Sequence, residues 1–292
     1  MIRVPFQFHR PHSIDEVVRL LSQCVQNGED VKLLAGGQSL MPSMNLGLVA
    51  PAHIVSLNHV AGLDSIRQDG DMLAIGAGTT HHALAKSEVV QAHCPILSET
   101  AACIGDVQVR NRGTLGGSIG HFDPAADYPP VLVLLDAACQ IVSPSGERTV
   151  AAKDVFVDYM TTSLSADEVL TEIRVPALPS DTGTAYVKFT RVEGGFAIVG
   201  AGACLRLNPD NTCRSIRVGI CGAAPVPVRL TAIEDTLTGK AVDDAFVEVV
   251  AAAAYESAHD PVAELHADAD YKREMVRVFT RRAVKTAWER AD

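Results

Sequence analysis

Apolar residues near the start of the chain recur at helical spacing. One helical face is formed by five of them: Ile14, Val17, Val18, Leu21 and Val25. Ser13 followed three residues later by Glu16 is a capping box, so a helix is predicted to begin there. Gly28 has the residue type that commonly ends a helix, which predicts a helix of about three turns.

Short apolar runs bounded by turn residues predict strands in the next part of the chain. The runs at 31–35 and 53–58 are typical of buried strands. Residues 65–77 predict a hairpin that turns at Asp69–Gly70, and residues 140–150 predict a second hairpin.

Helical patterns alternate with these strands. They cover 81–91 and 96–105, and Pro129–Pro130 suits the first turn of another helix. Ser165 and Glu168 fit a further capping box, which lies before residues 169–176. The stretch 176–183 has the composition of turns, so a domain boundary is predicted there.

Beyond this boundary the pattern changes to long β-like runs followed by two helices. The strands are expected at 185–192, 196–207 and 215–224, and the helices at 245–258 and 271–290. Met275, Val278, Phe279 and Arg282 recur at helical spacing, so the last helix is predicted to be amphipathic and to pack on the sheet.

Residues 109–127, VRNRGTLGGSIGHFDPAAD, follow neither a helical nor a strand period. This stretch contains a glycine loop, TLGGS at 114–118, and a similar loop, AGGQS, occurs earlier at 35–39. The loop at 35–39 is called the first glycine loop and the loop at 114–118 the second. Glycine lets successive backbone N–H groups face one concavity, which binds anions without a formal positive charge. The two loops therefore predict a phosphate-bearing ligand, although each alone is also compatible with a plain turn. No GxGxxG or GxxxxGK[ST] motif occurs, so neither a Rossmann nor a P-loop site is indicated.

Composition narrows the classes of partner. The net charge of −10 argues against nucleic acid and anionic membranes, which require a basic face. The seven cysteines contain no CxxC pair, so their spacing predicts no metal or iron–sulfur site, and reduced core thiols in a cytoplasmic protein are expected. No run reaches the ~18 apolar residues of a membrane span.

The order of these segments resembles the FAD-binding medium subunit of the molybdenum hydroxylases, the carbon monoxide dehydrogenase and xanthine dehydrogenase family. Matching segments run from about residue 6 to 287 and include LLAGGQSLMPSMNL, VRNRGTLGGSIGHFDPAADYP and VKFTRVEGGFAIVG. The resemblance implies an α+β fold with a two-lobed FAD-binding domain of the vanillyl-alcohol oxidase/PCMH type at 1–176. Its lobes are expected at about 1–57 and 58–176. A smaller α+β domain of the CO dehydrogenase flavoprotein type, a sheet packed by helices, is expected at 177–292.

The resemblance also implies a non-covalent FAD whose diphosphate is held by both loops. The matching residues are Ala35, Gly36, Gly37, Gln38 and Ser39, with Leu40 beside them, and Thr114, Leu115, Gly116, Gly117 and Ser118. The family usually has asparagine at position 118, and the serine here keeps a side chain that donates and accepts hydrogen bonds.

Further residues are assigned to the cofactor by the same resemblance. Asp127 matches a carboxylate near the adenosine half, and a charge at a helix N-terminus is the alternative. Lys188 matches a lysine at the pyrimidine edge of the flavin, where a fixed cation would raise the flavin potential. Phe196, after Gly194–Gly195, matches an aromatic residue beside the isoalloxazine, and a core phenylalanine is the alternative. His121 lies at the exit of the second loop, within reach of the cofactor.

Ile104 and Leu170 match apolar positions that line the flavin or the adenine, although most apolar residues belong to a core. Arg110 and Arg112 either contact phosphate, order a loop or face a partner, and the last two roles are favoured. Asp123 is interpreted as a loop-ordering residue.

The leading functional hypothesis is an electron-transfer subunit. In it, a large molybdopterin subunit oxidises the substrate, the [2Fe-2S] clusters of a small subunit pass the electrons on, and this chain's FAD delivers them to a terminal acceptor, in a dimer of heterotrimers. One alternative is a self-contained FAD-dependent oxidase or reductase, and another is a non-catalytic nucleotide-binding module. The substrate (carbon monoxide, an aldehyde, a purine or an N-heterocycle) and the acceptor stay open.

Overall fold

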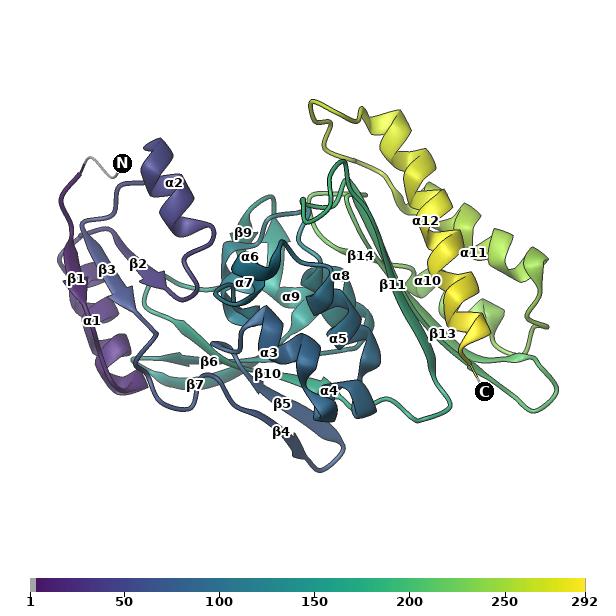
Figure 1. The fold of residues 1–292 in the computed structure, drawn as a ribbon, viewed down its shortest axis with the longest axis horizontal. Coiled ribbons are helices and arrows are strands. Elements are labelled where there is room, and N and C mark those ends of the chain that lie inside the picture. Colours follow the sequence, from purple (N-terminus) through teal and green to yellow (C-terminus); the bar gives the residue numbers. More distant parts are fainter. Residues whose placement is uncertain (1–3, 292) are drawn as a thin grey trace.

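Three main β-sheets follow one another along the long axis of the molecule, which a computed structural model describes for residues 4–291 (Figure 1). The first is a small parallel sheet with the strand order β1-β3-β2, and α1 packs on it. As predicted, the Ser13 hydroxyl caps α1 by accepting from the Glu16 N–H. Val25 was expected on the apolar face but is half exposed. The elements are β1 (Gln7–His9), α1 (Ile14–Gln26), β2 (Val31–Leu34), α2 (Leu40–Leu46) and β3 (His53–Ser56).

The second sheet is antiparallel, and it confirms both predicted hairpins. Its strands, in spatial order, are β4 (Ile66–Asp69), β5 (Met72–Gly76), β10 (Val169–Pro176), β6 (Ala138–Ser143) and β7 (Gly146–Ala151). The capping box before residues 169–176 starts no helix, although the Ser165 N–H donates to Glu168 at 2.8 Å. The segment that follows is the central strand instead, because Ile173 and Val175 alternate into the core.

A layer of short helices packs against this second sheet. Residues 81–91 were expected to form one helix, but it breaks at Ser87, whose hydroxyl caps the next helix by accepting from the Val90 N–H. The stretch 109–127 was expected to contain no helix, and this is wrong. Thr114 caps α7, and Leu115 and Ile119, four residues apart, are fully buried. The elements are α3 (His81–Lys86), α4 (Glu88–His93), α5 (Pro95–Ala102), α6 (Val107–Arg110), α7 (Leu115–His121), α8 (Tyr128–Leu134), α9 (Ala152–Val155), β8 (Phe156–Asp158) and β9 (Thr161–Thr162).

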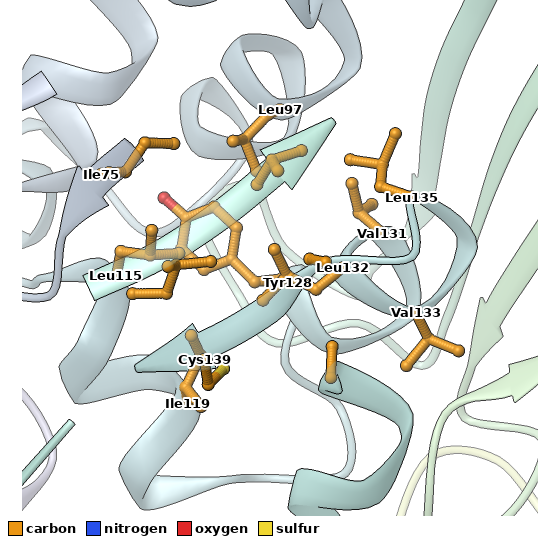
Figure 2. Close-up of a cluster of buried hydrophobic side chains, with 14 of the residues drawn as sticks. Ile75, Leu97, Leu115, Ile119, Tyr128, Val131, Leu132, Val133, Leu135 and Cys139 are labelled. Atoms are coloured by element: carbon orange, nitrogen blue, oxygen red, sulfur yellow. The ribbon is translucent and has the colours of Figure 1, made fainter. Parts of the chain in front are cut away.

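The main hydrophobic core lies between these helices and the second sheet. Figure 2 shows Tyr128 inside it, with Leu97, Leu115 and Leu132 around the ring. Tyr128 opens α8 directly before Pro129–Pro130, so the prolines occupy the first turn as predicted. This packing fixes α7, whose first turn contains the second glycine loop, and α8, which follows it.

The third sheet belongs to the C-terminal part of the chain, where α11 and α12 cover one face (Figure 1). The helices α5 and α8 contact the strands of the same sheet from the N-terminal part. A second hydrophobic core lies between this sheet and the helices α11 and α12. Phe279 and Ala283 of α12 are buried in it, which confirms that the last helix is amphipathic. The elements are β11 (Gly183–Phe189), β12 (Val199–Leu207), β13 (Cys213–Cys221), β14 (Val228–Arg229), α10 (Thr231–Leu237), α11 (Asp244–Ser257) and α12 (Ala269–Glu289).

Within residues 4–291, no helix is both long enough and apolar enough to cross a membrane.

Two glycines of the third sheet let α8 approach the strands closely. A Cβ at Gly202 would lie 2.8 Å from Leu134, and a Cβ at Gly219 would overlap the carbonyl oxygen of Pro130. We expect Gly219→Ala to lower the free energy of unfolding by about 1–3 kcal/mol, because the helix must move or strain. Urea denaturation with matched FAD content measures it.

The matched control is Gly120→Ala in α7, where an added Cβ meets nothing within 4 Å. Alanine is also the better helix former, so this variant should be at least as stable as the parent chain. Equal unfolding midpoints for the two variants would contradict the proposed close packing.

Candidate functional site

The two glycine loops are in direct contact. The first, 35–39, connects β2 to α2, and the second, 114–118, opens α7. A Cβ at Gly36 would overlap the carbonyl oxygen of Arg112, and a Cβ at Gly117 would lie 3.8 Å from that of Ala35. The Gly36 position therefore admits only a residue without a side chain, and the first loop packs there against the backbone of residues 112–113, directly before the second loop.

The two loops differ in the backbone donors that they leave free. The N–H groups of residues 36–40 find no hydrogen-bond partner within residues 4–291. In the second loop, by contrast, the N–H groups of Leu115, Gly116 and Ser118 bond to carbonyls, and that of Gly117 donates to the Thr114 hydroxyl at 3.0 Å. The expectation that both loops offer backbone donors therefore holds for the first loop only. In the second, the Leu115 and Gly116 N–H groups donate to the carbonyls of Thr79 and Ala77, and those of Gly117 and Ser118 donate to Thr114, which caps α7.

Side-chain hydroxyls complement these free amides. For the described part of the chain, the hydroxyls of Ser39 and Ser118 form no hydrogen bond, and both residues are partly exposed. Each is thus able to donate to a ligand oxygen. A set of free N–H groups and hydroxyls without a cation suits a phosphate or diphosphate group.

His81 packs against Gly113, the residue directly before the second loop. Its N–H donates to the Gly113 carbonyl at 2.9 Å, and its Nδ1 lies 3.0 Å from the Tyr128 hydroxyl. A Cβ at Gly113 would come within 2.6 Å of its Nε2. Burial, with a smaller contribution from the positive charge of Arg110, lowers the pKa of His81 to about 4, so the imidazole is neutral at pH 7.

Two charged residues of the stretch 109–127, Arg110 and Asp123, order loops. The Arg110 guanidinium donates to the carbonyls of Ile104 and Gly105 at 3.0 and 2.7 Å. The Asp123 carboxylate accepts from the Ala125 N–H at 2.8 Å, which confirms its interpretation as a loop-ordering residue. Arg112 is exposed, and its backbone rather than its guanidinium meets the first loop.

Asp127 and Lys188 form a buried ion pair. The Lys188 ammonium lies 2.9 Å from Asp127 Oδ2 and donates to the Cys103 carbonyl at 3.2 Å, and the Tyr186 hydroxyl donates to Asp127 Oδ1 at 2.7 Å. Burial raises the pKa of Asp127, while Lys188 and Tyr186 oppose that shift. The resemblance assigned Asp127 and Lys188 to opposite ends of a dinucleotide. Their contact places both at the same end of any extended ligand.

Phe196 lies on an exposed loop near this pair. Its side chain is 62% exposed, so it is no core residue in this chain. A Cβ at Gly194 would lie 3.0 Å from the carbonyl group of Gly105, so the loop rests on the segment that Arg110 orders. Leu115 and Leu170, by contrast, are buried in the main core, and Ile104 packs against that core.

Two residues of this site, Tyr186 and His81, were not predicted from the sequence to take part in it. Tyr186 holds the second oxygen of Asp127, and His81 holds the second loop. Tyr186 could have been found from its spacing, because residues two apart on a strand share a face and Lys188 already marked that face. His81 had no such signal, since its contacts depend on the packing of α3 against the loop.

Comparison with known proteins identifies the family of this chain. The profile of the family described as "FAD binding domain in molybdopterin dehydrogenase" matches residues 4–178, and that of "CO dehydrogenase flavoprotein C-terminal domain" matches residues 184–287. The chain belongs to the FAD-binding medium subunits of the molybdenum hydroxylases. This medium subunit is therefore part of an oxidoreductase, and its cofactor is FAD.

Similar proteins match this medium subunit over nearly its whole length. It is 40% identical to the carbon monoxide dehydrogenase medium chain of Hydrogenophaga pseudoflava over 99% of both chains. It is 36% identical to the 6-hydroxypseudooxynicotine dehydrogenase complex subunit alpha of Paenarthrobacter nicotinovorans, over 98% of this chain and 95% of that one. A solved chain of the Hydrogenophaga pseudoflava carbon monoxide dehydrogenase lacking the Mo-pyranopterin moiety superposes with a TM-score of 0.95, covering 100% of both chains. The fold expected from the resemblance is thereby confirmed.

The residues present fit the diphosphate of FAD. The five free N–H groups of 36–40 and the hydroxyls of Ser39 and Ser118 offer donors for its oxygens. Gly117 avoids a close contact inside the second loop, since a Cβ there would lie 2.7 Å from the Thr114 hydroxyl that accepts from the Gly117 N–H. All of these donors are neutral, and such a set suits an anion in a chain whose net charge is −10.

The neutral state of His81 predicts a pH dependence of stability. Its pKa is about 4 in the folded chain and 6.5 in the unfolded chain, so the unfolded chain binds more protons between these values. His81 therefore contributes stability that is complete above pH 6.5 and is lost as the pH falls toward 4, by about 3 kcal/mol. Comparing urea unfolding of the parent chain and His81→Gln at pH 7, 5.5 and 4.5 isolates this loss.

His82→Gln, at the exposed neighbour of His81, is the control and should follow the parent at every pH. If the His81→Gln variant lost stability with falling pH as steeply as the parent, a neutral buried His81 would be refuted.

Proposed function

We propose that this chain is the FAD-containing electron-transfer subunit of a multi-subunit molybdenum hydroxylase. It passes electrons from the [2Fe-2S] clusters of a partner subunit to a terminal acceptor. The observation that carries the proposal is the contact of the two glycine loops, with five unused N–H groups on the first, in a chain of this family. When bound, FAD supplies both one- and two-electron redox chemistry, and the protein positions and tunes it.

The glycine loops hold the diphosphate in this proposal. Residues Gly36–Ser39 donate backbone N–H groups, with Ala35 and Leu40 at the two ends of the donor arc. Gly117 leaves room for the ligand, Ser118 adds its hydroxyl, and Gly116 lets the loop pack closely against Ala77. Thr114 and Leu115 act indirectly, since Thr114 caps α7 and Leu115 anchors it in the core.

The Asp127–Lys188 pair and Phe196 bind the flavin end. The Lys188 ammonium already has its charge balanced by Asp127, so it presents a dipolar pair rather than a bare cation to the ligand. Tyr186 holds that pair in place. Phe196, on the exposed loop, is free to lie against an apolar ring. Ile104 and Leu170 bound the site from the core side, and His121 stays a predicted neighbour of the cofactor.

The proposed division of the chain into two domains follows the grouping of its strands into sheets. We keep the FAD-binding domain at 1–176, with lobes at about 1–57 and 58–176, and the C-terminal domain at 177–292. The strands of the first two sheets end at Pro176, and the third sheet begins at Gly183, which supports this division.

The partners in this proposal are a small iron–sulfur subunit and a large molybdopterin subunit, assembled as a dimer of heterotrimers in the cytoplasm. Two relatives support assembly with other subunits, since they are the medium chain of carbon monoxide dehydrogenase and a subunit of a dehydrogenase complex. The substrate of the assembly is selected outside this chain.

Gly117→Asp should abolish FAD retention, because it sets a negative side chain between the loops, against the diphosphate. Ser118→Asn is the matched control and should retain FAD, since the amide replaces the hydroxyl as a donor. The measurement is the ratio of flavin to protein absorbance after gel filtration. Normal flavin content in Gly117→Asp would remove the second loop from the site.

Anaerobic mixing experiments test the electron-transfer role. We expect the flavin absorbance of the FAD-loaded chain to bleach on mixing with the reduced iron–sulfur subunit of its complex, and to persist when small organic substrates are added to the chain alone. Bleaching by such a substrate without any partner would favour the self-contained oxidase or reductase. A chain that takes up no FAD would favour the non-catalytic nucleotide-binding module.

A further inference from the structure

A cluster of three different metal-ligating side chains lies in the first lobe, on elements that the proposed FAD site does not use. They are the thiol of Cys24 on α1, the carboxylate of Glu29 directly after α1, and the imidazole of His53 on β3. Their ligand atoms all lie within 4.8 Å of one another. Cys24 and His53 are buried, whereas Glu29 faces solvent, so the cluster opens to the surface on one side.

The end of α1 explains why Cys24 and Glu29 meet. The Glu29 N–H donates to the Cys24 carbonyl at 2.9 Å and the Gly28 N–H to the Val25 carbonyl at 3.0 Å, with Gly28 at φ +71°. This is a Schellman motif, which brings the residues five apart at its two ends side by side. Such a pair is usually apolar, but here it consists of a thiol and a carboxylate.

The same helix end favours a cation. The C-terminus of a helix carries partial negative charge, and the last turn of α1 contains no basic residue. The positive charge expected at such a position is therefore absent from the helix itself. Glu29 adds a further negative charge there.

His53 is oriented toward the cluster by a second histidine. Its Nδ1 lies 3.0 Å from Nε2 of His9 on β1, and its Nε2 lies 3.3 Å from the Glu29 carboxylate. When Nδ1 carries the proton and donates to His9, Nε2 holds a lone pair directed at Glu29 and Cys24. A histidine that ligates a metal commonly has its other nitrogen hydrogen-bonded in this way.

We propose that Cys24, Glu29 and His53 bind a divalent cation of the zinc type, with water as the fourth ligand. A thiolate, an imidazole and a carboxylate are the ligands that zinc takes in proteins, and three protein ligands leave one open position. The 3.3 Å between Nε2 and the carboxylate oxygen equals the edge of a tetrahedron with bonds of about 2.0 Å. The Cys24 sulfur lies within 4.8 Å of both atoms and has to move closer to complete the set.

Binding requires the Cys24 thiol to lose its proton. Burial and the nearby Glu29 raise the pKa of this thiol, so it is protonated at neutral pH before the cation arrives. The sulfur–hydrogen bond is then replaced by a sulfur–metal bond, and the proton leaves to solvent. The bound ion ties the end of α1 to β3, which pairs with β2, the strand that leads into the first glycine loop.

Zinc uptake by the full-length, FAD-loaded chain tests the proposal. After dialysis against a chelator, the chain is titrated with Zn²⁺ against a competing fluorescent indicator, and bound metal is counted by mass spectrometry. We expect about one ion per chain. Glu29→Gln and Cys24→Ser should each weaken binding at least about tenfold, and His9→Gln, through its effect on His53, by about 10- to 100-fold.

Two controls separate the cluster from other zinc ligands. Cys103→Ser removes the exposed thiol, and His12→Gln removes one of a pair of imidazoles 6.0 Å apart in the same lobe, so neither should change the affinity. With Co²⁺ as the probe, a thiolate charge-transfer band should appear in the difference spectrum and vanish in Cys24→Ser. No uptake by the parent chain, or equal affinity in the parent and Glu29→Gln, would overturn the proposal. Glu29→Gln is a surface change of equal size, so misfolding would not explain its result.

Discussion

The contact between the backbone of Gly36 and that of Arg112 is the constraint on which the site depends. The first loop is delivered by the small parallel sheet and the second by the helical layer, and each alone is an ordinary turn. They join because Gly36 has no Cβ, which would overlap the Arg112 carbonyl oxygen. Binding by a surface formed in this way relies on shape and on neutral donors, and the acidic character of the chain does not oppose it.

Elements with a strong local signal could be predicted from sequence. The capping box of α1, the turns at Gly70 and Gly146, and the amphipathic pattern of α12 each depend on neighbouring residues, and all three are present in the structure. The helices α2 and α7 were missed because they are one to two turns long and α7 contains three glycines. Burial of Leu115 and Ile119 stabilises α7, and that burial is a tertiary effect.

The candidate site could be predicted to the level of its loops but not of its donors. Glycine content and order identified residues 35–39 and 114–118. Which N–H groups remain free depends on where α7 begins, and this was not visible in the pattern. The pairing of Asp127 with Lys188, 61 residues apart, and of Cys24 with His53 across two elements, depends on the fold alone.

The Asp127–Lys188 pair also joins the two parts of the chain, since Asp127 precedes α8 and Lys188 lies on β11. A carboxylate this deeply buried is costly without its cation, and removing one partner of such a pair costs roughly 3–5 kcal/mol. The same junction contains the close approach of Pro130 to Gly219. A front half made alone would therefore lack the cation that neutralises Asp127 and would expose the face on which the third sheet packs.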